Sequence, residues 1–349
     1  MQKAGSGRAA NEALKIGSVV IGRNEGERLV ACLKSQSILP VAYVDSGSTD
    51  DSVANACKAG VSVIQLSTPP NFSAARARNA GMHALLSAEP DLEFIQMTDG
   101  DCVLRDGWIE RAVAALRADP GLAAVFGRRR ELHPERSVYN ALCDDEWNVP
   151  VGEVPACGGD ALFRVAALQS VGGYNDAMIA GEDPDLSMRL RRKGWRLERI
   201  DAEMTWHDAA ILHFSQFWNR TRRSGHAYAE LAQRYPDERW PNWTRSCQSI
   251  LFWGGVMPVA LIATVLLAIF LDPLWWIAAA AVFLPWPAKI AQLYVRQRRH
   301  GLSPKIALAS GAFLMIGKLP QFLGLASFYY GRWRKRSASL IEYKGPRSA

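Results

Sequence analysis

Two carboxylates separated by a single glycine, Asp99 and Asp101, follow the apolar run Phe94 to Met97. A short apolar run predicts a buried strand, so both carboxylates would stand at its carboxyl end, where open α/β sheets bind their ligands. Carboxylate oxygens are the ligands that Mg²⁺ and Mn²⁺ prefer. The pair therefore predicts metal and phosphate chemistry at the edge of a sheet.

A second acidic set, formed by Glu182, Asp183 and Asp185, surrounds Pro184. Pro184 suits the first position of a helix and Asp183 its N-cap, so a helix is expected to begin here. Capping accounts for one acid, although the positive end of the helix favours the others as well. A carboxylate that no metal requires would be free to act as a general base.

Polar residues follow two other predicted strands. Asn24 and Glu25 come after the apolar run 16–21, and Asp45 comes after the run 41–44. Because the carboxyl ends of parallel strands share one edge, these side chains are expected near the first acidic pair. For the Asp45 turn alone, a plain strand-to-helix turn with a capping residue explains the sequence equally well.

An alanine-rich helix that Ser73 opens carries candidates for phosphate binding. Arg78 and Asn79 lie in its first turns, and Arg78 would offer a diphosphate a planar fork of donors. Arg76 lies two positions before Arg78, so the two arginines point away from each other on a helix. We expect at most one of them to face the site.

Two further groups are weaker candidates. Gly158 and Gly159 are expected to open a helix and to let the backbone approach a ligand closely. His207 and His213 follow a strand that is expected from Trp195, and a lone histidine is more often structural than a ligand. The acidic run 144–146 is expected to form a solvated face.

Before about Arg245, charged and apolar residues are mixed as in soluble domains, and short apolar runs alternate with helical periodicity. This alternation predicts βαβ units, and hence an α/β domain with a mainly parallel sheet. The 349 residues are 49% hydrophobic, which is enough for a buried core. Six scattered cysteines without a Cys-x-x-Cys pair predict neither a zinc site nor a disulfide framework, and they fit a reducing cytosol.

The last third of the chain contains long, nearly uncharged stretches. Ser249 to Leu271 and Leu274 to Val295 are each long enough to cross a bilayer, which predicts a transmembrane helical hairpin. A third apolar stretch, Ile306 to Tyr330, contains Lys318 and Pro320 and ends before a basic tail. Spanning would place that tail outside, so we expect a re-entrant or interfacial segment instead.

The residues from His213 to Tyr235 predict an amphipathic helix, which would lie either on a membrane surface or on the soluble core. The net charge of +7 comes from basic clusters that crowd toward the apolar tail, so anionic lipids are better partners than nucleic acid. These clusters are 128–130, 189–196, 220–223, 296–299 and 332–336.

The expected organisation has five parts. Residues 1–14 form a mobile tail without the apolar core of a secretory signal, so the following domain should stay on the cytoplasmic side of the inner membrane. The other parts are a catalytic domain (15–212), the amphipathic interfacial helix and linker (213–245), two transmembrane helices (246–295), and a basic loop, apolar segment and basic tail (296–349).

Five stretches, in this order and spacing, resemble the motif set of glycosyltransferase family 2, which has the Rossmann-like GT-A fold. They are Val20 to Gly26, Val44 to Asp50, Ala77 to Gly81, Asp99 to Asp101 and Gly181 to Asp183. The resemblance covers about Ile16 to Tyr235. It implies inverting transfer of a sugar from a nucleotide diphosphate sugar, with Mg²⁺ or Mn²⁺ as the cofactor.

The resemblance also implies roles for the donor-side residues. Asp45 matches the acid that contacts the nucleotide base, and Asn24 and Glu25 match the loop beside the nucleoside. Arg78 and Asn79 match the pair that lines the diphosphate.

The remaining roles concern the metal and the acceptor. Asp101 matches the metal ligand, and Asp99 would contact ribose or the metal. His207 resembles the histidine that completes the metal site, with His213 as the competitor. Asp183 matches the general base, with Glu182 beside it.

The chain departs from the family's processive synthases, which carry Gln-x-x-Arg-Trp on an interfacial helix. Here Gln216 and Arg220 enclose Phe217 and Trp218. This departure favours transfer of one sugar to a lipid-linked or glycan acceptor at the membrane, in cell-surface or exopolysaccharide synthesis. The alternatives are a polyprenyl-phosphate sugar synthase and a non-catalytic, nucleotide-binding membrane subunit. A dehydrogenase lacks support because residues 22–26 do not match Gly-x-Gly-x-x-Gly.

Overall fold

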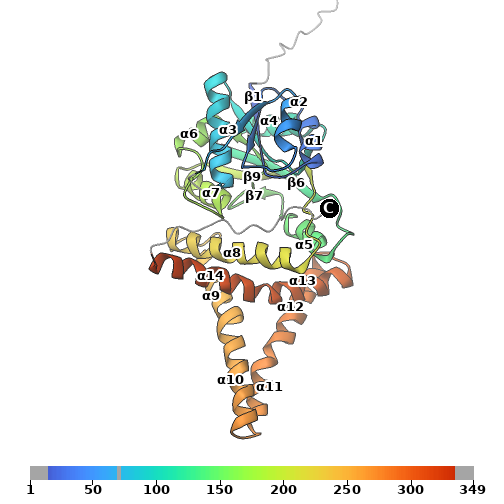
Figure 1. The fold of residues 1–349 in the computed structure, drawn as a ribbon, viewed down its shortest axis with the longest axis vertical. Coiled ribbons are helices and arrows are strands. Elements are labelled where there is room, and N and C mark those ends of the chain that lie inside the picture. The colour runs from blue at the N-terminus through green and yellow to red at the C-terminus, as the bar shows by residue number, and fades with distance from the viewer. Residues whose placement is uncertain (1–14, 69–71, 335–349) are drawn as a thin grey trace, which may run out of the picture.

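The computed structural model describes residues 15–68 and 72–334. Three layers follow one another along the longest axis of the molecule (Figure 1). An α/β domain stands at one end, two long helices cross beneath it, and a helical hairpin projects away from both. The tail expected at 1–14 and the end of the basic tail, from residue 335, lie outside the described residues.

A nine-stranded sheet forms the centre of the α/β domain, in the order β3-β2-β1-β4-β8-β6-β9-β5, with β7 beside β9. The strands are β1 (Ile16–Gly22), β2 (Val41–Asp45), β3 (Ser62–Gln65), β4 (Phe94–Asp99), β5 (Cys102–Leu104), β6 (Leu122–Glu131), β7 (Gly152–Glu153), β8 (Ala161–Arg164) and β9 (Arg196–His207). The central strands β1, β2 and β4 are buried almost throughout, which explains their continuous apolar runs.

The sheet is mixed, whereas the sequence pattern predicted a mainly parallel one. The neighbours β1, β2, β3 and β4 pair in parallel, as do β6 and β9. Antiparallel pairs are made by β8 with β4 and β6, and by β5 and β7 with β9. The helix expected after Gly159 is wrong, because Ala161–Arg164 is the buried strand β8. Four residues are too few for periodicity to distinguish the two.

Seven helices surround this sheet: α1 (Glu27–Lys34), α2 (Ser52–Lys58), α3 (Ala74–Ala88), α4 (Trp108–Ala118), α5 (Val138–Glu146), α6 (Val165–Ser170) and α7 (Glu182–Arg192). Ser73 caps α3 as expected, because its hydroxyl accepts from the Arg76 amide at 3.3 Å. The cap expected at Asp183 is wrong: Gly181 is the N-cap of α7 and lies in the left-handed region. Helix α7 therefore begins at Glu182, and Asp183 lies in its first turn.

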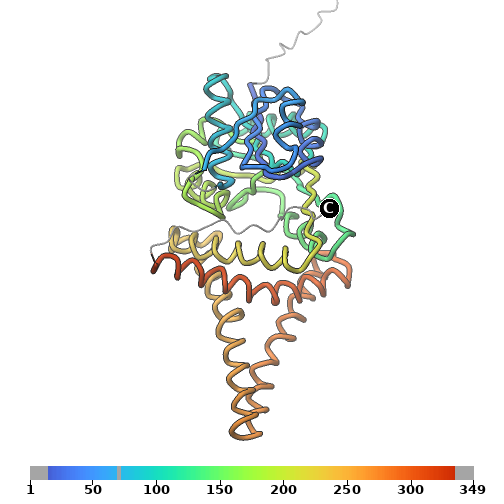
Figure 2. Tube along the Cα trace, viewed as in Figure 1, coloured from blue at the N-terminus to red at the C-terminus, as the bar shows by residue number. Residues whose placement is uncertain are grey.

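The remaining helices form the lower two layers. They are α8 (Phe214–Arg234), α9 (Trp243–Leu251), the π-helical turn η1 (Phe252–Val256), α10 (Met257–Phe270), α11 (Trp275–Phe283), α12 (Pro285–Arg299), α13 (Pro304–Ile316) and α14 (Lys318–Trp333). Helices α10 and α11 meet at the far end of the hairpin, while α8 and α14 run side by side beneath the α/β domain (Figure 2).

Helices α8 and α14 are so close that their backbones are in direct contact. A Cβ atom on Gly225 of α8 would overlap the Gln321 carbonyl of α14, and one on Gly324 of α14 would overlap the Arg222 carbonyl of α8. Helix α8 also contacts α13, because Phe217 of α8 packs edge-on against Phe313 of α13 with centroids 5.3 Å apart. The amphipathic helix expected from His213 to Tyr235 is thus present, and its partner is another helix of the tail.

Within the described residues, three helical stretches are long and apolar enough to cross a membrane: Trp243–Phe270, Trp275–Arg299 and Pro304–Trp333. The first two form the hairpin that the sequence predicted. The third runs crosswise to the hairpin and follows α8 (Figure 1). Its geometry differs from that of the other two, although its length and composition are similar.

The arginines of the basic cluster 128–130 pair with acids of the α/β domain. Arg128 pairs with Asp144 at 2.9 Å, and Arg130 pairs with Glu203 at 2.7 Å. Arg129 points into the site described below. All three arginines belong to β6, a strand flanked by β8 and β9, and the lipid contact expected for this cluster stays a prediction.

Helix α5 joins the α/β domain to the lower layers, so its acidic end is not simply a solvated face. Asp145 accepts a hydrogen bond from Gln297 of α12 at 2.9 Å, and Glu146 pairs with Arg220 of α8 at 2.9 Å. Tyr139 stacks on Phe217 with centroids 5.3 Å apart. These two acids therefore hold the α/β domain against α12 and α8.

Candidate functional site

The Asp-Gly-Asp turn follows β4 and is fixed to the neighbouring strand. The Gly100 amide donates to the Ile21 carbonyl of β1 at 2.8 Å. A Cβ atom on Gly100 would lie 3.1 Å from that carbonyl and 3.3 Å from Cγ of Glu25, so glycine suits this tight approach. The two carboxylates on either side of Gly100 contact different side chains: Asp99 contacts two arginines, and Asp101 contacts a histidine and a cysteine.

Arg78 gathers the first group of carboxylates. Its Nη2 lies 2.8 Å from Asp99, and its Nη1 lies 3.1 Å from Asp183 and 3.3 Å from Glu182. The guanidinium is buried, and it lies over the Tyr174 ring at 5.4 Å. Since a buried charge is costly unless it is paired, Arg78 links the β4 edge to the start of α7.

Arg129 of β6 approaches Asp99 from the other side. Its Nη2 lies 3.0 Å from Asp99 and 2.8 Å from the buried Asp160, which also accepts the Asp99 amide at 2.9 Å. Sequence reasoning missed both Arg129 and Asp160. Two signals were available in the sequence. Successive side chains of a strand point to opposite faces of the sheet, so Arg129 had to point away from Arg128 and Arg130. Asp160 is an acid that directly follows two glycines.

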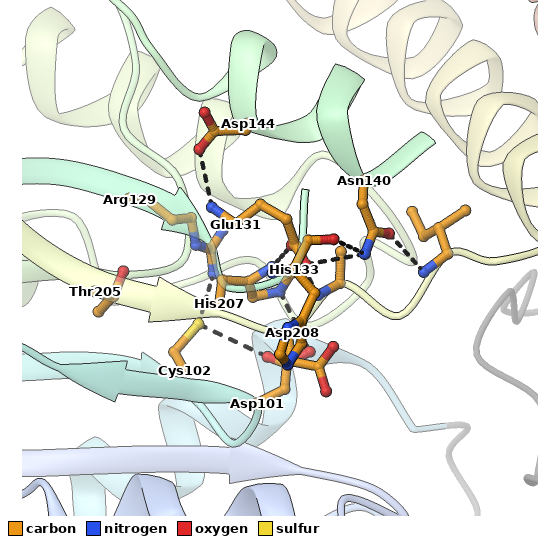
Figure 3. A network of polar contacts seen from close by, with 12 residues as sticks. Asp101, Cys102, Arg129, Glu131, His133, Asn140, Asp144, Thr205, His207 and Asp208 are labelled. Atoms are coloured by element: carbon orange, nitrogen blue, oxygen red, sulfur yellow. Dashed lines mark hydrogen bonds and ion pairs between the residues drawn. The ribbon is translucent and has the colours of Figure 1, made fainter. Parts of the chain in front are cut away.

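Asp101 enters the second group, with His207 and Cys102 (Figure 3). The Asp101 carboxylate lies 3.3 Å from His207 Nε2 and 3.7 Å from Cys102 Sγ. Cys102 of β5 stands opposite His207 of β9 in the antiparallel ladder, so their side chains share one face of the sheet. His207 therefore reaches the acidic turn. His213 does not take part, because it is the N-cap of α8.

Glu131 and Trp147 hold the His207 ring. Glu131 stands opposite His207 on β6, with its carboxylate 3.7 Å from Nδ1. Trp147 packs edge-on against the imidazole, with centroids 4.6 Å apart. Burial, together with the nearby charge of Arg129, lowers the pKa of His207. The imidazole is therefore neutral near pH 7 and can act as a metal ligand.

Glu182 and Asp183 lie together at the start of α7. Burial raises the pKa of Asp183 to about 7, Arg78 opposes this rise, and the charges of Glu182 and Asp99 add to it. A carboxylate with such a pKa exchanges a proton readily at neutral pH. The Asp183 side chain remains 18% exposed, so the group can be reached from outside.

The two candidate glycines have different surroundings. A Cβ atom on Gly159 would overlap the Arg78 guanidinium and would lie 3.2 Å from Asp99. A Cβ atom on Gly158 would meet nothing within 4 Å. Gly159 thus leaves room for the central arginine, whereas Gly158 is exposed.

Asn24, Glu25 and Asp45 meet in a separate loop cluster at the ends of β1 and β2. Asp45 accepts the amides of Gly47 and Ser48 at 2.9 and 2.8 Å. Asn24 accepts the Thr49 amide at 2.7 Å, so the two loops hold each other. Glu25 pairs with Arg28 at 2.6 Å. These candidates lie at the same sheet edge, as expected, and they also build the edge itself.

Asn79 is turned away from the acidic groups. Its amide nitrogen donates to the Tyr174 carbonyl at 2.8 Å and to Asp176 at 2.7 Å, and its oxygen accepts the Tyr174 amide at 2.8 Å. Both hydrogens of the side-chain amide are engaged. Asn79 therefore fixes the loop that follows α6, and the expectation that it lines the diphosphate receives no support from this geometry.

Known proteins resemble this chain in fold and in sequence. A mannosyltransferase of Pyrobaculum calidifontis, solved with GDP-Man and Mn²⁺, superposes with a TM-score of 0.55 at 17% identity, covering 88% of this chain and 87% of its own. In two strains of Mycobacterium tuberculosis, pre-mycofactocin glycosyltransferase is 29% identical over 244 residues. That match covers 64% of this chain, and the chain spans about half, 48%, of the length of these relatives.

Two family profiles match the chain. The profile of glycosyl transferase family group 2 matches residues 147–294. The profile of glycosyl transferase family 2 matches residues 19–218, which is more than half of the 349 residues and includes both acidic groups. The α/β domain has the GT-A fold, and the chain belongs to glycosyltransferase family 2.

Proposed function

We propose that the chain transfers one sugar from a nucleotide diphosphate sugar to an acceptor at the membrane, with inversion at the sugar carbon and with the help of a divalent metal. One observation carries the proposal: Arg78 joins Asp99 of the Asp-Gly-Asp turn to Asp183 at the start of α7, and Arg129 contacts the same Asp99 from β6. In this arrangement an arginine that could bind a diphosphate, Arg78, directly contacts Asp183, a carboxylate that could accept the proton of the acceptor.

The metal would bind at Asp101 and His207. These residues fit a dication, because a buried carboxylate faces a neutral imidazole across 3.3 Å. When bound, Mg²⁺ or Mn²⁺ supplies positive charge to the departing diphosphate. The Mn²⁺ and GDP-Man solved with the Pyrobaculum calidifontis mannosyltransferase support the use of a divalent metal. Asp99, which the resemblance also implied as a ligand, contacts both arginines and would position them.

Arg78 and Arg129 would bind the diphosphate and stabilise it as it leaves. Each guanidinium offers donors in a fixed fork, and each is held by carboxylates rather than by solvent. Donors that are fixed before the reaction lower the barrier because nothing has to reorient as charge develops. Asn24, Glu25 and Asp45 would form the nucleoside side of the same edge.

Asp183 would accept the proton of the acceptor hydroxyl. Its raised pKa places it near the pH at which it would work, and Arg78 holds the carboxylate beside the diphosphate groups. Glu182 raises that pKa further by its like charge. Direct displacement of the diphosphate by the deprotonated hydroxyl inverts the sugar carbon.

The acceptor would be lipid-linked or a membrane-associated glycan. In this proposal the hairpin from α9 to α12 spans the inner membrane, with the catalytic domain on the cytoplasmic side. A surface hollow of about 740 Å³ along α12 supports a contact with anionic lipids. Its lining includes the cations Lys289, Arg296 and Arg299. Synthesis of cell-surface polysaccharide or exopolysaccharide is the process that such an acceptor suggests.

Purified full-length protein in lipid, screened with nucleotide sugars for nucleoside diphosphate release, tests this function. We expect release that depends on divalent metal and falls to background in Asp101→Ala. Asp183→Asn should bind donor and lose transfer, while the matched control Asp91→Asn, on an exposed carboxylate, should behave as wild type. Absence of release with every donor would instead indicate a nucleotide-binding subunit without catalysis.

One outcome would favour a polyprenyl-phosphate sugar synthase. A phosphate acceptor is already ionised and does not need a base. Full transfer by Asp183→Asn would therefore refute the role given to Asp183 and point to a phosphate as the attacking group.

A further inference from the structure

Cys102 has no role in the glycosyl transfer described above, yet it lies among the groups that would bind the metal. One potential ligand atom from each of Asp101, Cys102 and His207 lies within 4.8 Å of the others, and all three residues are buried. Within residues 15–68 and 72–334, no other trio of His, Cys, Asp or Glu side chains forms such a group. The geometry follows from the strand register, which sets Cys102 opposite His207.

The three ligand types differ in their preference for metals. Carboxylate oxygen suits Mg²⁺ and Mn²⁺, imidazole suits several transition metals, and thiolate sulfur favours Zn²⁺ and other thiophilic ions. A site with Asp, His and Cys, with its fourth position open, has the composition of a zinc centre. A serine, alanine or valine at position 102 would leave only the oxygen and nitrogen ligands.

We propose that Cys102 is a third protein ligand of this metal centre, which therefore binds Zn²⁺ and Co²⁺ in preference to Mg²⁺. The inference rests on the proposed function, because it concerns the same metal site. The thiol releases its proton to solvent as the bond between sulfur and metal forms. Zn²⁺ would thus compete with the ion that supports turnover.

The surroundings of Cys102 are compatible with an added dication. Arg129 Nη2 lies 3.2 Å from the sulfur, which already acts as an acceptor there (Figure 3). The same guanidinium is paired with Asp99 and Asp160. Its charge is therefore balanced within the site, and a metal beside Cys102 would not meet an uncompensated cation.

Absorption spectroscopy with Co²⁺ tests the proposal without relying on turnover. Titrating the purified full chain with Co²⁺ should produce visible bands of the bound ion together with a near-ultraviolet charge-transfer band from sulfur. Cys102→Ser should lose the near-ultraviolet band and keep the visible ones. Two controls should retain both: Cys143→Ser, at a buried thiol outside the group, and Cys57→Ser, at the exposed thiol.

Competition between Zn²⁺ and Mn²⁺ for the purified protein tests the same proposal through the relative affinities of the two ions. We expect Cys102→Ser and Cys102→Ala to weaken binding of Zn²⁺ relative to Mn²⁺ by about tenfold or more, the scale of losses at altered metal sites. Thermal unfolding of each variant shows whether the protein is still folded, and the alanine variant supplies a second test if serine itself binds metal.

The outcomes separate this inference from the proposed function. Co²⁺ that binds without a charge-transfer band, or a band that survives in Cys102→Ser, would overturn Cys102 as a ligand and leave metal-dependent glycosyl transfer intact. Absence of any Co²⁺ or Mn²⁺ binding would overturn both.

Discussion

Asp99 illustrates how one residue can hold two functional groups together. Its two carboxylate oxygens contact different arginines, Arg78 from α3 and Arg129 from β6. Each arginine then reaches further acids, so four carboxylates surround two buried guanidinium groups. Removing one partner from such a network leaves a buried charge unpaired, which typically costs about 3–5 kcal/mol. Activity and stability are therefore coupled at these positions.

The two adjacent glycines provide a matched test of the position of Arg78. Gly159→Ala adds a methyl group that overlaps the guanidinium, whereas Gly158→Ala adds the same group to open space. We expect Gly159→Ala to lower kcat/KM by roughly 10²-fold, because small displacements in an active site have effects of this size. Gly158→Ala should stay within a factor of about two of wild type. Equal losses in both variants would show that Arg78 is not the residue affected.

The pKa of Asp183 predicts the pH dependence of transfer. The base must be ionised, so the rate should rise as pH increases through about 7 and level off above it. In Glu182→Gln a neighbouring negative charge is removed, the pKa of Asp183 falls, and the rising limb should move to lower pH by about one unit. Glu203→Gln, at an exposed pair with Arg130, is the control. A limb that stays in place or moves upward in Glu182→Gln contradicts the assignment.

Residues of the candidate site could be predicted from sequence where they belong to short local motifs. They were harder to predict where their contacts join elements that are distant in sequence. Asp99, Asp101 and Asp183 could be named as candidates from local sequence because motif and spacing are local properties. Arg129 was hidden within a basic triplet whose other members pair elsewhere. Asn79 stood beside Arg78 in the motif, yet on a helix adjacent residues face different directions. Its contacts with Tyr174 depend on tertiary structure.

At the scale of elements, α8 and α14 form the layer on which the α/β domain rests. Their closest points are glycines, Gly225 on α8 and Gly324 on α14, and the carbonyl oxygens that face them. Small residues let two helices approach until their backbones touch, which increases dispersion contacts along the whole length. The distance between α8 and α14 therefore depends on glycine at positions 225 and 324, because any larger side chain there would push the helices apart.

Gly324→Ala should separate these helices. The added Cβ overlaps the Arg222 carbonyl, which is backbone and cannot rotate away. We expect destabilisation by about 1–3 kcal/mol, as for other overpacked sites, measured by thermal unfolding in detergent. Ala326→Leu places a larger change at an exposed position of the same helix and should have little effect. Equal stability of Gly324→Ala and wild type would refute the close contact.

The strands of the parallel half could be predicted from sequence because each is a buried apolar run with a polar end. The strand β8 could not, since four residues fit either periodicity. The cap expected at Asp183 is wrong because Gly181 precedes the helix with a φ angle of 83°, a left-handed conformation that glycine adopts without strain. Pairing of α8 with α14 joins segments distant in sequence, and hydrophobic patterns do not specify such partners.

At the scale of the whole molecule, α5 lies between the candidate site and the helices α8 and α12. Its last residues bind α8 and α12, while Trp147, directly after it, contacts the His207 ring and lies beneath Arg129 at 5.1 Å. A shift of α8 or α12 would therefore pass through α5 and Trp147 to two residues of the proposed site. These are Arg129, proposed to bind the diphosphate, and His207, proposed to bind the metal. The arrangement suits an enzyme whose acceptor arrives from that side.

The orientation of the molecule can be tested with its own cysteines. Cys57 is exposed, and the other five cysteines are buried or partly buried. If the α/β domain is cytoplasmic, a membrane-impermeant maleimide should label Cys57 in lysed bacteria and leave it unlabelled in intact cells. In a Cys57→Ser background, Asp272→Cys at the far turn of the hairpin should be labelled from outside. The reverse pattern would invert the proposed topology.

The contact between α8 and α14 also has a consequence for biosynthesis. Between the end of α8 at Arg234 and the start of α14 at Lys318 lie the hairpin and α13. At about 5–20 residues per second, a ribosome needs several seconds to make this stretch. During that time the glycine face of α8 is present without its partner. The newly made enzyme therefore completes its lower layer only after the hairpin has been delivered, and premature release of the chain would leave α8 uncovered.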